Sequence, residues 1–272
     1  MTGPSVVAIG GGHGLSTVLE AMVDRASSLV GVVSVADDGG SSGRIRRDLD
    51  IVAPGDMRRC LAALTPEGLM RDALEHRFEG GVLAGHPAGN VVLAAMLELE
   101  PDPVVVMDTL VEMVGARGRV LPATSAAVDL VATTERGTVK GQVAISESGA
   151  IRSLRFLPVD PDVPVAVSEA IVDADLIVLG PGSLYSSVLA PVVPGVAAAL
   201  QRRSGVLAYV ANLSAEPGET DGYDLDDHVE AVERHGISPD VVIVDANAYI
   251  PCRQQDRIRT YELAGALQSA HD

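Results

Sequence analysis

The chain has 272 residues, 47% of them hydrophobic and 3% aromatic, and its 37 acidic and 20 basic side chains give a formal net charge of −17. A chain of this length buries roughly three quarters of its unfolded surface, so it needs neither disulfides nor metals to support a core. Its acidity excludes a general nucleic-acid binder or a protein held on anionic membranes, because both need a basic surface, and it argues against a phosphate ligand as well.

Short β-branched runs, Gly-rich or polar turns and helical stretches follow one another along most of the chain. The first unit predicts a strand over Ser5 to Ile9, a turn of glycines, and a helix whose apolar residues recur at helical spacing from Leu15 to Val23. Further strands are predicted at 30–36, 175–179, 206–210 and 241–244. Continuous apolar strands between helices are covered on both faces, so these runs predict a largely parallel sheet.

This alternation stops from about Arg119 to Pro158, where polar and apolar residues alternate around two glycine-containing turns. The pattern is typical of antiparallel strands. No linker, low-complexity tract or internal repeat divides the chain. We therefore expect one doubly wound α/β domain over residues 1–272, with an antiparallel β insertion at about 119–158.

The Gly-rich and polar turns follow predicted strands, so they leave the sheet at its carboxyl edge, where ligands of such sheets bind. The first of these turns consists of Gly10, Gly11, Gly12, His13 and Gly14. Backbone amides at a helix start suit a phosphate, although a tight turn without a ligand explains the glycines equally well. The dinucleotide fingerprint fails because a leucine replaces its third glycine, and no Gly-Lys-Ser/Thr follows to make a P-loop.

The second turn joins Asp37 and Asp38 to a Gly-Gly-Ser-Ser-Gly segment. The two carboxylates could take a ribose hydroxyl or Mg²⁺, although Asp and Gly are also ordinary turn formers. Asp56 lies at the start of a predicted helix, where it is either a cap or a third metal ligand. We expect function at Asp37 and Asp38, because they are more than a turn requires.

Arginine is the dominant basic residue, since Lys140 is the chain's sole lysine. Coding composition explains this bias, and so does bidentate recognition of phosphate. Five arginines fall within sixteen residues, namely Arg44, Arg46, Arg47, Arg58 and Arg59. They form either a solvated helix face or part of an anion site.

Three later turns complete the predicted edge. His86 and Asn90 lie in the turn before an apolar helix, and His86 is a general base, a hydrogen-bond donor to a ligand or a structural residue. Gly182 and Ser183 offer amides and a hydroxyl to an anion, and Asn212 follows the next strand. Ser183 is a weak nucleophile because no His or Lys base is identifiable beside it. We expect neither a nucleophile–base–orienter triad nor a zinc site.

The sequence also indicates where the protein works. No run of about 20 apolar residues could span a bilayer, and no basic region precedes the first apolar run, so we expect a cytoplasmic protein. The two cysteines, Cys60 and Cys252, are too few for a disulfide framework and are expected to be buried or free thiols.

Several long segments, in chain order from about Val6 to Asn247, resemble the CofD-like superfamily and, within it, the gluconeogenesis-factor (YvcK-type) branch. These segments are VVAIGGGHGLS, SVADDGGSSGR, PGDMRRCLAAL, GHPAGNVVLAAM, DLIVLGPGSLYSSVLAPVVPG and NLSAEPGETDGYDLDDHVEAVERHG. Two departures are His13, where the branch usually has Thr, and the Pro-Ala of the Gly-His-Pro-Ala-Gly-Asn turn, where it has Ser-Leu. The match fades after Asn247.

The resemblance implies a Rossmann-like fold and a cytoplasmic protein that binds a UDP-sugar such as UDP-N-acetylglucosamine and influences cell shape, wall synthesis and carbon metabolism. The sibling branch consists of Mg²⁺-dependent 2-phospho-L-lactate transferases, which use a guanosine diphosphate carrier in coenzyme F420 biosynthesis. Carried over by motif, the diphosphate meets Gly10 to Gly14 and Gly182-Ser183. The metal or polar ligand groups then lie near Asp37, Asp38 and Asp56, and Asn90 and Asn212 line the crevice.

Two functions therefore stand beside each other. The first is a nucleotide-sugar-binding regulatory protein, which the lack of an identifiable nucleophile or base favours. The second is a Mg²⁺-dependent transferase acting on a diphosphate-linked donor, a reaction that needs mainly positioning and charge neutralisation. Because the dinucleotide-binding fingerprint is incomplete, an NAD-dependent oxidoreductase is the least favoured function. The sequence leaves open whether the chain forms a homo-oligomer.

Overall fold

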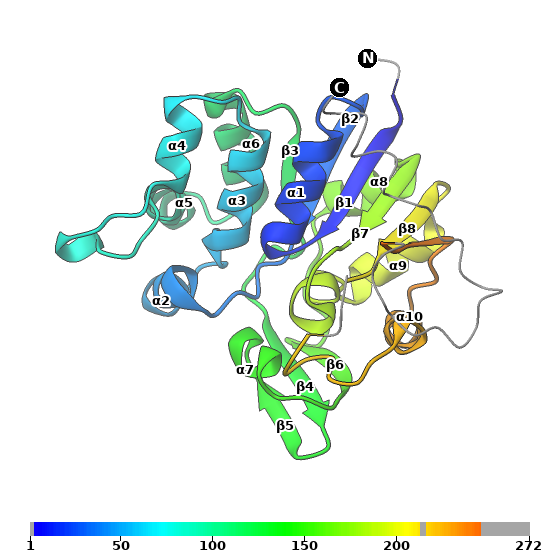
Figure 1. Ribbon diagram of the computed structural model, residues 1–272. Helices are drawn as coiled ribbons and strands as arrows, with labels where there is room; N and C mark the ends of the chain where they lie inside the picture. The colour runs from blue at the N-terminus through cyan, green and yellow to red at the C-terminus, as the bar shows by residue number, and fades with distance from the viewer. Residues whose placement is uncertain (1–2, 213–215, 246–272) are drawn as a thin grey trace.

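Apolar β-branched runs form a six-stranded parallel sheet in the computed structural model, which describes residues 3–212 and 216–245 (Figure 1). In spatial order its strands are β3 (Arg119–Pro122), β2 (Ser28–Val33), β1 (Ser5–Gly10), β7 (Leu176–Leu179), β8 (Val206–Val210) and β9 (Val241–Ile243). The direction of strand succession reverses between β1 and β7. This arrangement confirms the doubly wound α/β fold expected from the sequence.

Alternate side chains of β1 point into two separate cores, one on each face of the sheet. Val6 and Ala8 belong to the core formed with α1 (Gly12–Met22), α3 (Pro54–Leu64), α5 (Ala88–Leu99) and α6 (Pro103–Val114). Val7 and Ile9 belong to the other core, formed with α8 (Val165–Asp173), α9 (Pro194–Arg202) and α10 (Leu225–Arg234). Burial on both faces explains why the strand reads as an unbroken apolar run.

The long connection between β2 and β3 contains α2 (Gly40–Leu49), α3, α4 (Leu69–Glu75), the 3₁₀ turn η1 (Gly81–Leu83), α5 and α6. Residues 76–87, which we call the arm, extend away from the body between α4 and α5 (Figure 1). The foot of the arm is closed by a bridge between Arg77 and Pro87 and by an N–H of Phe78 that donates to the His86 carbonyl at 3.1 Å. Val82 near its tip is 98% exposed.

A second, antiparallel sheet has the order β5-β4-β6 and comprises β4 (Asp129–Thr134), β5 (Gly137–Lys140) and β6 (Ile151–Leu157), with α7 (Gln142–Ser146) between β5 and β6. The expected insertion is therefore present, but its antiparallel part begins at Asp129 rather than near Arg119. Arg119–Pro122 instead pairs in parallel with β2, with Val30 opposite Arg119. Four residues are too few to separate the two kinds of strand by pattern alone.

The sequence also predicts the state of the two cysteines and the absence of a membrane-spanning segment. Cys60 is a buried free thiol on α3, as expected, whereas Cys252 lies outside the described residues. Within the described parts of the chain, none of the helices has the length and apolar character needed to cross a membrane.

Candidate functional site

A cavity of about 250 Å³ lies beyond the carboxyl ends of β1 and β2, where the N-termini of α1, α2, α3, α5 and α7 meet. Its lining comprises Gly12, Asp37, Gly39, Gly40, Ser41, Ser42, Gly55, Asp56, Arg58, Arg59, Arg77, Pro87, Asn90 and Gln142. Each helix N-terminus presents unsatisfied N–H groups and a partial positive charge. The cavity is therefore suited to an anion although the whole chain is acidic.

The glycines around the cavity have two different roles. Gly12 adopts a φ of +62° and Gly40 a φ of +47°, and a Cβ on either would meet no atom within 4 Å, so both leave their backbone open. Gly11 and Gly14 instead allow close packing. A Cβ at Gly11 would lie 2.9 Å from Oδ2 of Asp56, and one at Gly14 would lie 2.0 Å from the Pro181 carbonyl oxygen.

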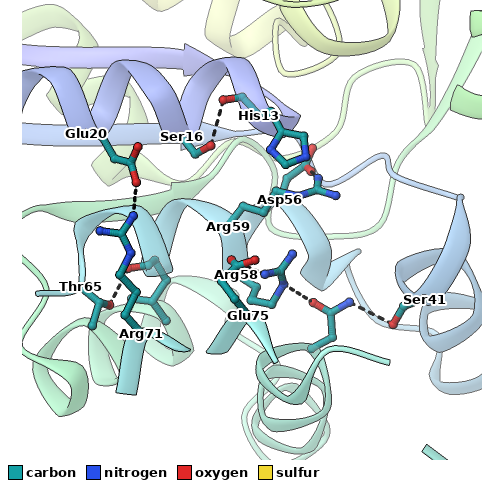
Figure 2. Close-up of polar contacts among 12 residues, drawn as sticks. His13, Ser16, Glu20, Ser41, Asp56, Arg58, Arg59, Thr65, Arg71 and Glu75 are labelled. Carbon is teal, nitrogen blue, oxygen red and sulfur yellow. Dashed lines mark hydrogen bonds and ion pairs between the residues drawn. The ribbon is translucent and has the colours of Figure 1, made fainter. Parts of the chain in front are cut away.

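Two carboxylates stand at the cavity wall. Asp56, in the first turn of α3, is 3% exposed and pairs with Arg59 at 2.7 Å (Figure 2). Burial raises the pKa of Asp56, and the nearby charge of Asp37 raises it further, whereas Arg59 and the backbone N–H of Gly12 oppose the shift. Asp37 accepts a hydrogen bond from the Gly39 N–H at 2.9 Å. The buried Asp56 carboxylate therefore carries a cost that a cation between the two acids would relieve.

The structure shows whether the three carboxylates expected to bind Mg²⁺ have suitable positions. No set of three or more His, Cys, Asp or Glu side chains suitable for a metal occurs among residues 3–212 and 216–245. Mg²⁺, however, is usually held by one or two carboxylates, with water and phosphate oxygens completing its shell. Asp37 and Asp56 fit that donor set. Asp38 points elsewhere, because its Oδ1 accepts the N–H of Val143 at 3.0 Å and so binds the first turn of α7.

A chain of buried polar side chains runs along one side of the cavity. Nε of Arg58 donates to Oδ1 of Asn90 at 3.0 Å, and Nδ2 of Asn90 donates to Oγ of Ser41 at 3.1 Å (Figure 2 shows Arg58 and Ser41 at its two ends). Ser41 lies 2.8 Å from Nδ1 of His86. Arg58 is also ion-paired with Glu75 of α4. Arg58, Asn90 and Ser41 are 3%, 2% and 7% exposed, so the network fixes their side chains.

The hydrogen bond between Ser41 and His86 was not expected from the sequence. These residues are 45 positions apart and come from different turns, so neither local spacing nor a short motif connects them. Arg77 and Gln142 were missed for the same reason, since the arm and α7 reach the cavity only in the folded chain. The one usable signal was that the turns carrying Ser41 and His86 both precede helices and were both expected near the carboxyl edge.

The predicted arginines separate into two groups. Arg58 and Arg59 line the cavity, and Arg77 from the arm joins them. Arg46 instead pairs with Asp129 at 2.7 Å and ties α2 to the antiparallel sheet. Arg44 and Arg47 are not part of the cavity lining. Part of the arginine cluster therefore lines the cavity, and part of it holds structural elements together.

The turn after β7 is not part of the cavity lining, although its Ser186 carbonyl accepts a hydrogen bond from the lining residue Gln142 at 2.6 Å, and several of its N–H groups bind acceptors within the protein. The N–H of Gly182 donates to Oδ1 of Asn212 at 3.2 Å. The N–H groups of Tyr185 and Ser186, at the start of the π-helix η2 (Leu184–Val188), donate to the buried carboxylate of Glu219 at 2.7 and 3.3 Å. The sequence predicts an external anion at the helix start beside Gly182 and Ser183. In the structure, this helix start already binds the internal carboxylate of Glu219.

His13 is exposed and lies outside the cavity lining, as do Gly10, Gly11 and Gly14. The carbonyl of His13 accepts hydrogen bonds from the Ser16 hydroxyl at 2.9 Å and the Thr17 hydroxyl at 3.0 Å, which fixes the first turn of α1. Of the first Gly-rich turn, Gly12 alone belongs to the lining of this cavity.

Comparison with known proteins agrees with the fold. The family described as 2-phospho-L-lactate transferase CofD matches residues 6–272. A relative from Mycobacterium tuberculosis that carries the gluconeogenesis-factor name is 44% identical over 93% of this chain and 79% of its own length. The gluconeogenesis factor of Bacillus subtilis is 40% identical over 85% of this chain and 75% of its own.

A solved structure of a UPF0052-family protein from Bacillus halodurans superposes with a TM-score of 0.87 at 36% identity, covering 99% of this chain and 91% of that one. Sequence and structure therefore agree over nearly the whole length. The chain belongs to the CofD family and, within it, to the gluconeogenesis factors.

Proposed function

We propose that the protein binds a nucleotide sugar of the UDP-N-acetylglucosamine type and holds its diphosphate in the cavity at the carboxyl edge of the sheet. The observation that carries this proposal is the meeting of the N-termini of α1, α2, α3 and α5 around an open cavity with Arg58, Arg59 and Arg77 in its lining. Helix N-termini and arginines bind phosphate oxygens without any need for a basic surface elsewhere.

Mg²⁺ is proposed as the companion of the diphosphate. Asp37 and Asp56 would hold it, and its charge would offset both the carboxylates and the phosphates. Asp38 has a structural part in this proposal, because it fixes α7 and thereby the Gln142 side chain of the cavity lining.

We further propose that this binding serves regulation in the cytoplasm: of carbon metabolism, as the gluconeogenesis-factor name suggests, and of cell shape and wall synthesis, as the resemblance of the sequence motifs implies. A second candidate is a Mg²⁺-dependent transferase acting on a nucleotide-diphosphate-linked donor such as a GDP-linked one. The pair Asp37 and Asp56 beside an anion site favours it, because group transfer at phosphorus needs charge neutralisation above all.

Calorimetry with UDP-N-acetylglucosamine, UDP, GDP and NAD, each with and without Mg²⁺, tests the proposal. We expect both uridine ligands to bind, more tightly with Mg²⁺ than without it. The variant Asp56→Asn keeps the shape of the side chain but removes its charge. It should lose most of the enhancement by Mg²⁺, by about tenfold or more in Kd, equivalent to about 1.4 kcal/mol.

Asp24→Asn is the matched control, since Asp24 is exposed and forms a surface ion pair with Arg117. It should bind as the unmodified protein does. If no uridine ligand binds and GDP does, the UDP-sugar proposal is refuted and the transferase is favoured. An Asp56→Asn variant with an undiminished effect of Mg²⁺ would exclude the proposed metal position.

A further inference from the structure

We propose that Ser41 and His86 form a nucleophile–base pair that cleaves the diphosphate of the bound nucleotide sugar through a covalent intermediate on Ser41. The inference rests on the proposed function, because it needs the diphosphate in the cavity. It extends that function from binding to turnover. Four observations carry it: the direction of the hydrogen bonds at Ser41, the charge state of His86, the position of Ser41 on its helix and the lining of the cavity.

The donor and the acceptor of each hydrogen bond around Ser41 can be assigned from the chemistry of Arg58. Arginine has only donors, so the atom of Asn90 that faces Nε of Arg58 is its oxygen, and the amide nitrogen must face Ser41. Oγ of Ser41 therefore accepts a hydrogen bond from Asn90, and its own proton is free for Nδ1 of His86 at 2.8 Å. A hydroxyl that donates to an imidazole within hydrogen-bond reach is the arrangement of an activated serine nucleophile.

His86 can act as the acceptor only while its imidazole is neutral. Partial desolvation lowers the pKa of His86, and the charges of Arg44 and Arg77 lower it further, whereas Asp48 opposes them. This lowered pKa favours the neutral ring at neutral pH, and a neutral ring with its proton on Nε2 leaves Nδ1 free to accept. The backbone of His86 is held by the N–H of Phe78 at 3.1 Å, and its own N–H donates to the Leu83 carbonyl at 2.9 Å.

Ser41 is the second residue of α2, a ten-residue helix whose N-cap, Gly39, makes no side-chain cap. A nucleophile at this position lies in the partial positive charge of the helix N-terminus, which stabilises negative charge developing on an attacked phosphoryl group. Arg58 and Arg59 line the same cavity and can stabilise that charge as well. Ser41 itself lines the cavity, so a diphosphate placed there lies next to it. His86 is not part of that lining and instead lines a neighbouring cavity of about 320 Å³, so it reaches the diphosphate only through Ser41.

The reaction has two balanced steps. In the first, Oγ of Ser41 bonds to the phosphorus next to the sugar while its proton passes to Nδ1 of His86. The bond from that phosphorus to the bridging oxygen breaks, and uridine monophosphate leaves with the electron pair and takes a proton from solvent, while His86 releases the proton of Ser41 to the solvent of its own cavity. In the second, water bonds to the same phosphorus and releases a proton to solvent. The Oγ–phosphorus bond breaks, and Oγ regains a proton through His86, so the net products are uridine monophosphate and a sugar phosphate.

The test incubates the full chain with UDP-N-acetylglucosamine and magnesium chloride. Chromatography measures release of uridine monophosphate, and intact-mass spectrometry with peptide mapping measures the covalent adduct, which has the mass of N-acetylglucosamine phosphate less one water. We expect release and an adduct on the peptide that contains Ser41. Ser41→Ala should abolish both, and His86→Gln should slow release by about 100-fold or more, the usual contribution of a general base.

His76→Gln is the matched control, because His76 is an exposed histidine at the same foot of the arm and is not part of the cavity lining. It should leave release unchanged. Binding of UDP-N-acetylglucosamine without release or adduct, or release that persists in a folded Ser41→Ala variant, would overturn the inference and leave the proposed function standing. Failure of every uridine ligand to bind would overturn both. The adduct on the unmodified protein needs no variant to fold, so the test does not depend on Ser41→Ala alone.

Discussion

Individual residues at the cavity combine packing with chemistry, and Gly11 shows this most clearly. It is buried and has an ordinary extended backbone, with φ at −145°, so conformational freedom does not explain a glycine there. The nearby Oδ2 atom of Asp56 does, since a Cβ would approach it to 2.9 Å. The need for glycine at this position therefore comes from the carboxylate, not from the turn.

This leads to a prediction for Gly11→Val. The branched side chain must push the Asp56 carboxylate from its position, so we expect calorimetry with Mg²⁺ to show nucleotide-sugar binding weakened at least as much as in Asp56→Asn, by about tenfold or more in Kd. The fold should persist, at a cost of about 1–3 kcal/mol for overpacking. Circular dichroism and thermal unfolding check the second point.

Gly80→Val is the comparison for this variant, because Gly80 also has an extended backbone and a Cβ there meets nothing within 4 Å. It should bind normally. Unchanged affinity in a folded Gly11→Val variant would show that the position of the Asp56 carboxylate beside Gly11 does not affect binding.

At the scale of elements, the π-helix η2 has an unusual partner at its start. Glu219 is 1% exposed, and its carboxylate accepts the N–H groups of Tyr185 and Ser186. Burial raises the pKa of Glu219, while these hydrogen bonds act in the opposite direction. The carboxylate thus meets the partial positive charge of the helix start and satisfies two otherwise buried donors.

We predict that Glu219→Ala lowers the free energy of unfolding by about 1–3 kcal/mol, because two buried amides lose their acceptor. Glu219→Gln, which retains one oxygen, should lose less. Urea unfolding measures both. Glu230→Ala on α10, an exposed position, should stay close to the unmodified protein. Equal stability of Glu219→Ala and the unmodified chain would mean that the η2 amides find other acceptors.

At the scale of the whole molecule, the fold could be predicted well from the sequence. Strands such as Ser5–Gly10 are buried on both faces, so their apolar runs are unbroken and the turns that follow them are rich in glycine. The start of the antiparallel sheet was harder, because Arg119–Pro122 is a short edge strand whose parallel partner, β2, is distant in sequence. Pairing of this kind depends on tertiary contacts.

The site was predictable only in part, for a physical reason. Asp37, Asp56, Gly12 and Asn90 follow strands or start helices, and that local signal places them at one edge. The approach of Ser41 to His86 depends on how α2 packs beside the arm, and the direction of Asp38 toward Val143 depends on the antiparallel sheet. The spacing of residues along the sequence predicts neither contact.

The overall charge gives one further prediction. If the ligand is the proposed nucleotide sugar, the net charge of −17 would repel it during its approach, although the helix N-termini would attract it inside the cavity. Added salt screens this long-range repulsion, with a screening length of about 8 Å at physiological ionic strength. We therefore expect the association rate constant, measured by stopped flow without Mg²⁺, to rise with sodium chloride. A falling rate would mean that the local positive field of the cavity governs the encounter.

The carboxylate of Glu219 also bears on binding stoichiometry. In a doubly wound sheet, the helix starts that follow β1 and β7 flank the point where strand order reverses, so each half of the fold offers a place for an anion. At the helix start that follows β7, the chain supplies its own anion, because the Glu219 carboxylate accepts the Tyr185 N–H. Of the two helix starts, we therefore expect the one at the cavity beside β1 and β2 to take the external diphosphate, and equilibrium binding to give one nucleotide sugar per chain.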